Sequence, residues 1–337
     1  MSKVSSQSKL TKQELKSIIN SNGDIKSFDD VGVSTKTIIA ISNIIIDLEK
    51  LYTYIPITEY NPLEKKRGRK KRIAIEPIIK ILPQGSIILT QRKNEHRGVL
   101  LKNKCKANNT FFLHSVTIVL SLENNKFINI KVSSNGKFQI TGCKNETQYI
   151  NTILHIFIAM INIETMTGEK CYKFNNSDSC LKVIFNTVMQ NMDFNIGFNI
   201  SRDKLDKFIN CNTQFVSIFE GSISTGVNVK IKSDQVNDAF LTELQYDIVD
   251  KMVNIVKVPY INYFNLLEDK EKKKEGNKEK HHTFLIFASG SIIMSSRGPD
   301  MKRVFNKLIN TLLDNKHKFE DKTIEHEKII TEITHLE

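Results

Sequence analysis

The sequence predicts an α+β protein built from two copies of one unit of antiparallel strands and helices. Residues 128–143 and 284–296 each have the pattern of two apolar strands joined by a glycine turn, and a helical pattern follows each of them at once. The turn glycines Gly136 and Gly290 are 154 residues apart, and the same number separates Thr37 from Asn191 in the first strands of the two copies. Because an internal repeat decides architecture before any single residue does, we expect a pseudo-two-fold fold.

The first copy is expected over residues 36–163. Its β-branched residues 37–43 predict a strand, and residues 47–54 predict a short helix with Asp47 in its first turn. Further strands are expected at residues 87–90, 98–101, 116–122, 127–132 and 138–141. Residues 145–161 close the copy as an amphipathic helix, because apolar residues recur on one face at helical spacing: Ile150, Ile153, Leu154, Phe157 and Met160.

The second copy, over residues 181–316, repeats this order. Strands are expected at residues 183–192, 226–231, 284–287 and 292–295, and helices at residues 203–210 and 300–315. The remaining segments are a polar appendage, a basic insertion, a polar linker, a second insertion and a charged tail, at residues 1–35, 63–76, 164–180, 232–282 and 317–337.

Composition favours an anionic partner for a chain with no sign of catalysis. The net charge of +12 over 337 residues suits nucleic acid first and a membrane surface second. Five well-separated cysteines indicate reduced thiols of an intracellular protein rather than a zinc site, and we expect no metal and no cofactor. No catalytic or phosphate-binding motif occurs, so we expect no enzyme.

The two adjacent histidines and the apolar runs of the chain predict neither a metal site nor a membrane span. His281 and His282 have no acid or cysteine at ligand spacing and fit a solvated strand edge better than a metal site. No apolar run approaches the roughly 18 residues of a membrane span, and the first residues are unlike a signal peptide, so a soluble protein is expected.

A run of seven cations in eight residues stands between the first helix and the following strands. Its members repel one another and must be solvated, which favours an exposed loop or a nuclear address. Alternatively, Arg67 and Arg69 flank a glycine as in an AT-hook, an element that suits the narrow minor groove of A·T tracts, although the usual proline is absent. The cations are Lys65, Lys66, Arg67, Arg69, Lys70, Lys71 and Arg72.

Four segments resemble the TATA-box-binding protein family in their order along both copies. They are residues 190–192 (Gln-Asn-Met), 59–62 (Glu-Tyr-Asn-Pro), 136–142 and 285–290, within a resemblance that covers roughly residues 36–315. The resemblance implies a saddle, in which a curved antiparallel sheet turns its concave face to the DNA minor groove and carries its helices on the convex face. It also implies that residues 103–126 and 232–282 are enlarged stirrup loops.

The resemblance further implies a set of DNA contacts on the concave face. The family's central asparagine matches Asn191, with Thr37 in its place in the first copy, and one wedge phenylalanine matches Phe287. The other implied contacts are Ile39, Ile130, Val132, Gln139, Thr141, Leu285, Ile293 and Ser295. Apolar side chains and isolated donors are what the degenerate minor groove accepts.

Two departures set this chain apart from the family. The other wedge positions hold His96, Val132 and Ser224, unless Phe215 or Phe219 substitutes in a different register. Asp193 stands where the family has an apolar contact residue, and its carboxylate should repel DNA unless it is paired. We therefore expect the two copies to share a fold but to contact DNA through different residues.

Two functions follow from these features. The first is a monomeric transcription initiation factor that binds AT-rich double-stranded DNA and recruits RNA polymerase or a transcription factor IIB-like protein. The second is a protein-interaction scaffold of a transcription or packaging complex, with weak or non-specific DNA binding. Heavy use of Asn, Ile and Lys is typical of AT-rich genomes, such as those of large DNA viruses. We expect action in a nucleus or a cytoplasmic viral factory, or packaging in a virion.

Overall fold

The chain folds into two compact units. A computed structural model describes residues 27–61, 81–101, 114–175, 179–222, 225–233, 240–277, 279–298 and 300–322. The first-repeat unit comprises Thr35–Met189 and Val236–Asn277, and the second-repeat unit comprises Met1–Ser34, Gln190–Gln235 and Lys278–Glu337. Each unit has its own apolar core, and the units are described separately below.

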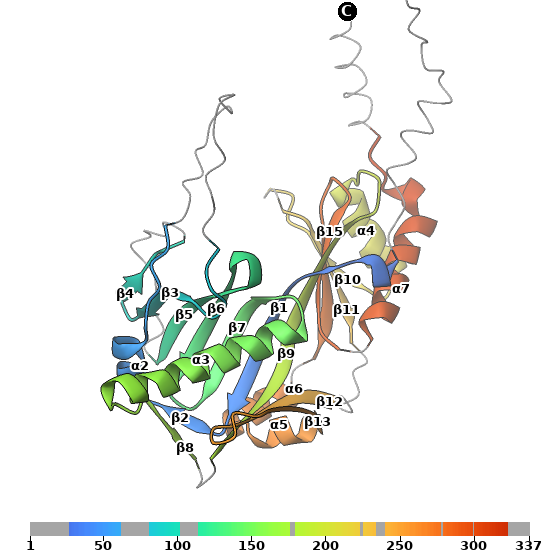
Figure 1. Cartoon of the computed structure of the whole chain (residues 1–337). Coiled ribbons are helices and arrows are strands. Elements are labelled where there is room, and N and C mark those ends of the chain that lie inside the picture. Colours follow the sequence, from blue (N-terminus) through green and yellow to red (C-terminus); the bar gives the residue numbers. More distant parts are fainter. Residues whose placement is uncertain are drawn as a thin grey trace, which may run out of the picture. The chain divides into compact units, whose positions relative to one another are not determined.

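The first-repeat unit is an antiparallel sheet with helices on one face (Figure 1). Its strand order is β1 (Val33–Ser42), β7 (Lys137–Cys143), β6 (Lys126–Ser133), β5 (Ser115–Leu122), β3 (Ile87–Arg92) and β4 (Glu95–Gly98). Helices α2 (Leu48–Tyr54) and α3 (Glu146–Thr167) pack on alternate residues of these strands, such as Ile38 and Ile140. A small pair, β2 (Ile44–Ile46) with β8 (Tyr172–Phe174), and the 3₁₀ turn Glu123–Asn125 complete this part.

Local sequence explains where the helices of this unit begin and end. The Asp47 side chain accepts hydrogen bonds from the backbone N–H groups of Glu49 and Lys50, at 3.0 and 3.1 Å, and so caps α2. Asn145 caps α3, and Gly168 ends it with φ of 72°. Helix α3 has the length and composition of a membrane span, but nine of its residues are buried in the unit, as in a core helix.

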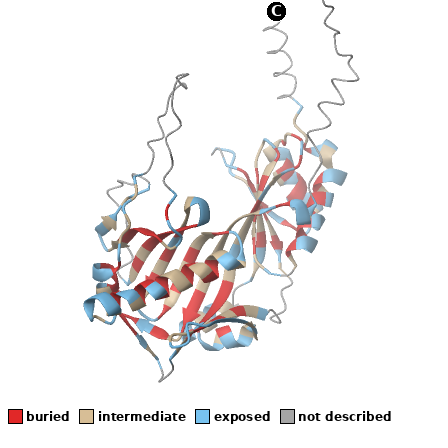
Figure 2. Ribbon diagram, viewed as in Figure 1, coloured by how far each residue is buried: buried red, intermediate tan, exposed pale blue. Residues whose placement is uncertain are grey.

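The second-repeat unit repeats this arrangement with a sheet of five strands. Residues 190–195 of β9 (Cys180–Asn195) are followed across the sheet by β15 (Ser291–Ser296), β14 (His281–Ile286), β11 (Val227–Lys232) and β10 (Val216–Ile218). Helices α4 (Arg202–Asn212) and α7 (Met301–Asp314) cover one face, and the 3₁₀ turns Phe28–Asp30 and Lys316–Lys318 belong to the same unit. Buried residues alternate with partly exposed ones along β11, β14 and β15 (Figure 2).

Backbone hydrogen bonds confirm the duplication at an offset of 154 residues. Ser42 N donates to Gly136 O at 3.1 Å, and Ile196 N donates to Gly290 O at 3.0 Å. The bond from Ile46 N to Ser134 O recurs as the bond from Ile200 N to Ala288 O, both at 2.8 Å. Each bonded residue of the second unit lies 154 positions after its counterpart in the first, so the first strand and the last hairpin of the two units share one register.

The glycines at the two turns share a positive φ and a close approach to a backbone oxygen. Gly136 and Gly290 have φ of 73° and 76°, a region that L side chains rarely adopt. A Cβ atom on Gly136 would lie 2.0 Å from the Ile44 carbonyl oxygen, and one on Gly290 would lie 2.2 Å from that of Phe198. Close backbone approach therefore requires glycine at both positions.

Residues 232–282 are not an enlarged loop, contrary to expectation. They contain β12 (Phe240–Asp247), β13 (Val253–Pro259), α5 (Tyr260–Asn265) and α6 (Asp269–Asn277), most of which belong to the first-repeat unit. Strand β12 pairs antiparallel with residues 180–185 of β9, and β13 pairs with β12. We call residues 240–277 the folded insert. The linker expected at residues 164–180 likewise holds the end of α3 and all of β8.

Candidate nucleic-acid interface

The second-repeat unit leaves one face of its sheet without helices. Side chains on this face alternate with those packed under α4 and α7, and they come from paired strands: Asn191 stands opposite Ser295, and Leu285 opposite Ile293. All four are partly exposed. Phe287 follows β14 directly, is half-buried, and stands outside the buried core cluster. The structure thus brings together the five contact residues expected in the second copy.

Asn191 is held by two hydroxyl groups. Ser295 Oγ donates to Asn191 Oδ1 at 2.8 Å, and Ser34 Oγ donates to the Asn191 backbone oxygen at 3.1 Å. Within the described residues the Asn191 amide nitrogen has no acceptor. An oriented amide donor beside apolar neighbours matches the A N3 and T O2 acceptors of the minor groove.

Asp193 is the acidic residue of this face. It lies opposite Ile293, two residues after Asn191, and is exposed. Lys230 lies on the same face of β11, opposite Thr283. The face therefore mixes apolar, amide, hydroxyl and charged groups instead of presenting a uniform positive surface.

The first-repeat unit carries the equivalent residues in the same register. Thr37 stands opposite Thr141 and Ile39 opposite Gln139, which is the pairing of Asn191 with Ser295 and of Asp193 with Ile293 at the constant offset. Asn129 and Lys131 on β6 extend this face, opposite Thr141 and Gln139. Sequence reasoning missed these two residues, although the offset applied to Thr283 and Leu285 would have found them.

Ile130 and Val132 do not belong to this face, so their expected positions are wrong. Both are fully buried on the helix-covered side, where they pair with Ile140 and Phe138 in the core. A register error of one residue moves every side chain of a strand to its other face. At the constant offset, Ser133 rather than Val132 corresponds to Phe287, so the first copy has no apolar wedge at this position.

Of the other wedge candidates, the two phenylalanines belong to the second-repeat core or pack beside it, whereas strand pairing places His96 on the same sheet face as Gln139 of the first repeat. Phe215 is buried in the second-repeat core, and Phe219 packs beside that core under the guanidinium group of Arg202. His96 is exposed on β4. Ser224 and the cationic run at residues 65–72 lie outside the described residues.

Comparison with known proteins finds relatives of this chain in large DNA viruses. No family model matches the chain. The chain is 26% identical over 303 residues to the uncharacterized protein 335L of Invertebrate iridescent virus 6, covering 86% of this chain and 85% of that protein. It is 33% identical over 116 residues to a TATA-box-binding protein-like protein of Acanthamoeba polyphaga mimivirus, a match of 33% of this chain and only 32% of that relative.

Over about a third of its length the chain resembles a TATA-box-binding protein-like (TBP-like) protein, and both relatives are proteins of large DNA viruses. Among solved structures, the Methanococcus jannaschii TATA-box-binding protein aligns over 84% of this chain and 98% of its own, with 12% identity and a TM-score of 0.40.

In this TBP-like chain the folded insert covers part of the first-repeat face. Ile41 and Ile184 are buried against Tyr263 of α5 and against Leu267, and Ile39 packs at the edge of this cluster. At its polar rim, Asn135 Nδ2 donates to Glu268 Oε1 at 3.4 Å, and Lys137 pairs with Glu271. Ile39 is therefore a packing partner of the insert, and the two TBP-like repeats present different surfaces.

His282 is buried in the second-repeat core, which corrects its expected place at a solvated strand edge. Its Nε2 lies 3.0 Å from Asp300 Oδ2, and its Nδ1 contacts Ser296 Oγ. Ser233 Oγ donates to the same carboxylate at 3.1 Å. Because Ser296 is itself buried, this group is closed to substrates and stabilises the junction between β14 and α7.

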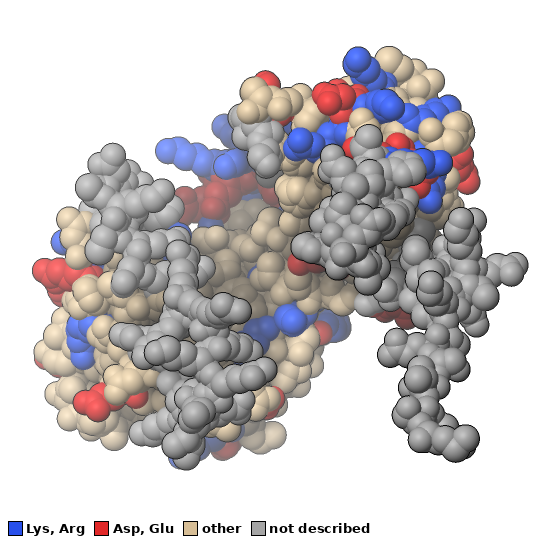
Figure 3. Space-filling view, turned by 90° about the horizontal axis from the view of Figure 1, so that it is seen from above, with Lys and Arg blue, Asp and Glu red and all other residues tan. Residues whose placement is uncertain are grey.

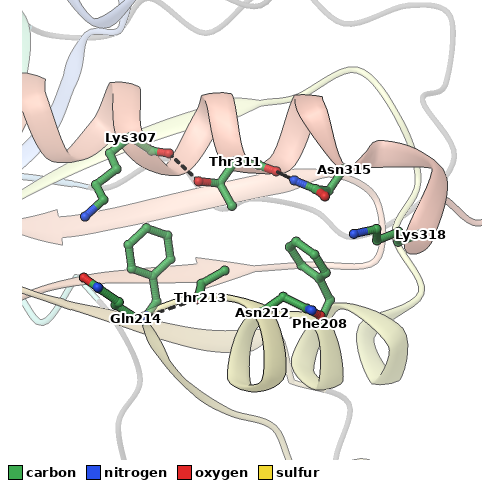
Figure 4. Close-up of a pocket in the computed structure, with 9 residues that line it drawn as sticks. Phe208, Asn212, Thr213, Gln214, Lys307, Thr311, Asn315 and Lys318 are labelled. Carbon is green, nitrogen blue, oxygen red and sulfur yellow. Dashed lines mark hydrogen bonds between the residues drawn. The ribbon is translucent and has the colours of Figure 1, made fainter.

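A groove of about 510 Å³ lies between α4 and α7 on the helix-covered side of the second repeat (Figure 4). Lys307 Nζ stands 5.3 Å from the centre of the Phe215 ring, and Lys318 Nζ stands 4.9 Å from that of Phe208. Thr311 and Asn315 line the α7 side. Amides, hydroxyls and two cations suit a polar or acidic protein segment better than an apolar ligand.

The thiols and the surface drawn in Figure 3 have ordinary chemistry. On the face drawn in Figure 3, acidic and basic side chains are interspersed among the described residues. Burial raises the pKa of the Cys143 and Cys171 thiols to about 11, so neither is a reactive thiolate near neutral pH. Within the described parts of the chain, no group of three or more His, Cys, Asp or Glu residues could hold a metal ion.

Proposed function

We propose that this protein is a transcription initiation factor that binds AT-rich double-stranded DNA through the open face of its second repeat and recruits polymerase machinery. The Asn191–Ser295 pair carries this proposal, because it orients an amide donor on the same face as the apolar side chains of Ile293 and Leu285, on the two neighbouring strands β15 and β14. The name of the mimivirus relative supports the same reading.

The proposed contact is a minor-groove contact with one wedge. Asn191 donates to base acceptors, Ile293 and Leu285 lie against sugars and base edges, and Phe287 inserts at a base step. The saddle-shaped arrangement of the family would supply the curved surface. Relatives in large DNA viruses favour action in an infected cell's nucleus or in a cytoplasmic viral factory.

Substitution of two residues tests the proposal. Asn191→Ala together with Phe287→Ala should weaken binding to an AT-rich duplex by about tenfold or more, since groove contacts contribute roughly 1–3 kcal/mol each. Gel-shift titrations against AT-rich and GC-rich duplexes measure this, with circular dichroism as the folding control. Asn306→Ala with Tyr54→Ala is the matched control, because both of these side chains are exposed and lie away from the face. Unchanged AT-rich affinity in the first double variant would refute the proposal.

A second function, a protein-interaction scaffold, is favoured by exposed apolar groups on the insert. Phe240, Val249 and Met252 are 69%, 78% and 67% exposed, and Val253 and Ile255 lie on β13, which pairs only with β12 among the described strands. Concentrated exposed apolar groups typically mark a protein-binding surface. Equal affinity for AT-rich and GC-rich duplexes, together with stable co-assembly with a polymerase subunit, would favour this function over the first.

A further inference from the structure

Helix α6 separates its charges onto two faces. Glu271 pairs with Lys137 of the sheet, and Glu268, at the start of the helix, accepts from Asn135 Nδ2. Glu275 accepts a hydrogen bond from the Tyr260 hydroxyl at 3.3 Å. These carboxylates are therefore turned toward β7 and α5.

The opposite face of α6 carries three lysines, with the exposed Asp269 at its first position, four residues before Lys273. Lys270, Lys273 and Lys274 are exposed, and their spacing of three and four residues places them in one stripe on a helix. No carboxylate of the described chain forms an ion pair with them. Three lysines against the single exposed carboxylate of Asp269 leave this face of α6 with a net positive charge, while Glu271 and Glu275 contact the rest of the unit.

Helix α6 belongs to the insert that packs on the side of the first-repeat sheet expected to contact DNA. The insert packs on the side of the first-repeat sheet that carries Thr37, Ile39 and Gln139, with Leu267 buried against that side just before the helix begins. A duplex approaching this side of the first-repeat sheet would meet the insert before it met Ile39. The lysine stripe faces away from the sheet, where phosphate groups would lie.

We propose that α6 replaces the covered sheet as the DNA contact of the first-repeat unit, with Lys270, Lys273 and Lys274 binding phosphate oxygens of duplex DNA. This inference rests on the proposed function only in taking duplex DNA as the ligand. The first repeat then supplies affinity without sequence preference, because phosphate contacts position a protein but carry no base information. Discrimination between sequences is left to the second repeat.

The test is the salt dependence of binding. Each phosphate contact contributes about 0.9 to the slope of log affinity against log salt concentration, so Lys270→Gln, Lys273→Gln and Lys274→Gln together should reduce the slope by roughly 2 to 3. The loss of affinity should be equal on AT-rich and GC-rich duplexes. The charge-matched control changes Lys204, Lys207 and Lys302, exposed residues of helices α4 and α7, to Gln and should leave the slope unchanged.

Other outcomes overturn the inference. An unchanged slope in the α6 variant, with an unchanged circular dichroism spectrum, would refute it. Tighter binding of Leu267→Glu, which loosens the insert, would also refute it by showing that the insert competes with DNA. Failure of the proposed function is distinguishable: equal affinity of the wild-type protein for AT-rich and GC-rich duplexes would contradict that function, while the slope still decides the role of α6.

Discussion

Two glycines hold the turns of the two repeats in a backbone conformation that other residues adopt only with strain. Gly136 combines a φ of 73° with a backbone oxygen 2.0 Å from where its Cβ would stand. Gly168, at the end of α3, has a φ of 72° but no atom within 4 Å of that point. Comparison of Gly136 with Gly168 therefore separates the cost of backbone strain, which both share, from the cost of a steric clash, which only Gly136 has.

We predict that Gly136→Ala destabilises the protein more than Gly168→Ala does. Strain alone costs on the order of 1 kcal/mol, whereas a required backbone shift at Gly136 adds further cost. Urea unfolding of the two variants measures the difference. Equal losses of unfolding free energy would mean that the close approach to Ile44 can relax freely.

At the level of elements, regular patterning made most of the fold predictable. Apolar strands around the recurring glycine turn predicted the hairpin β14–β15, and apolar residues at helical spacing predicted the helices α3 and α7. For the open face of the second repeat, the family resemblance rather than any pattern pointed to Asn191, Leu285 and Ile293, and the structure has them at partly exposed positions of paired strands.

The rest depended on contacts that a local pattern does not contain. The folded insert is stabilised by pairing of β12 with β9 and by packing of α5 on Ile41, both distant in sequence. The placement of Ile130 was wrong for a different reason. Buried and partly exposed residues alternate along its strand, but this alternation does not tell which face the helices cover. The offset of 154 residues does: it pairs Ile130 with the buried Phe284, and Lys131 with Leu285.

Packing of α5 on the first-repeat sheet can be tested directly. Tyr263→Ala should lower the free energy of unfolding by about 3–5 kcal/mol, because the ring is 4% exposed within an apolar cluster. Ile261→Ala, on the same helix at 54% exposure, should change it by less than about 0.5 kcal/mol. Urea titration measures both values, and a small effect of Tyr263→Ala would contradict the covered face.

For the whole molecule, duplication has produced two repeats with one register and different surfaces. Asn191, Ser295 and Phe287 in the second repeat correspond to Thr37, Thr141 and Ser133 in the first, and the insert covers only the first. An apolar wedge offsets the cost of unstacking a base step, and a serine does not. DNA held by this protein should therefore be kinked at one end of the site only.

The bend angle of an AT-rich duplex is the most direct test of this account. We predict a bend well below the roughly 80° that the TATA-box-binding protein itself imposes, because one wedge remains. Fluorescence energy transfer between the duplex ends measures it, and Phe287→Ala should straighten the DNA while leaving residual binding. A straight duplex in the wild-type complex, or a bend that survives Phe287→Ala, would contradict DNA binding through the open face of the second repeat.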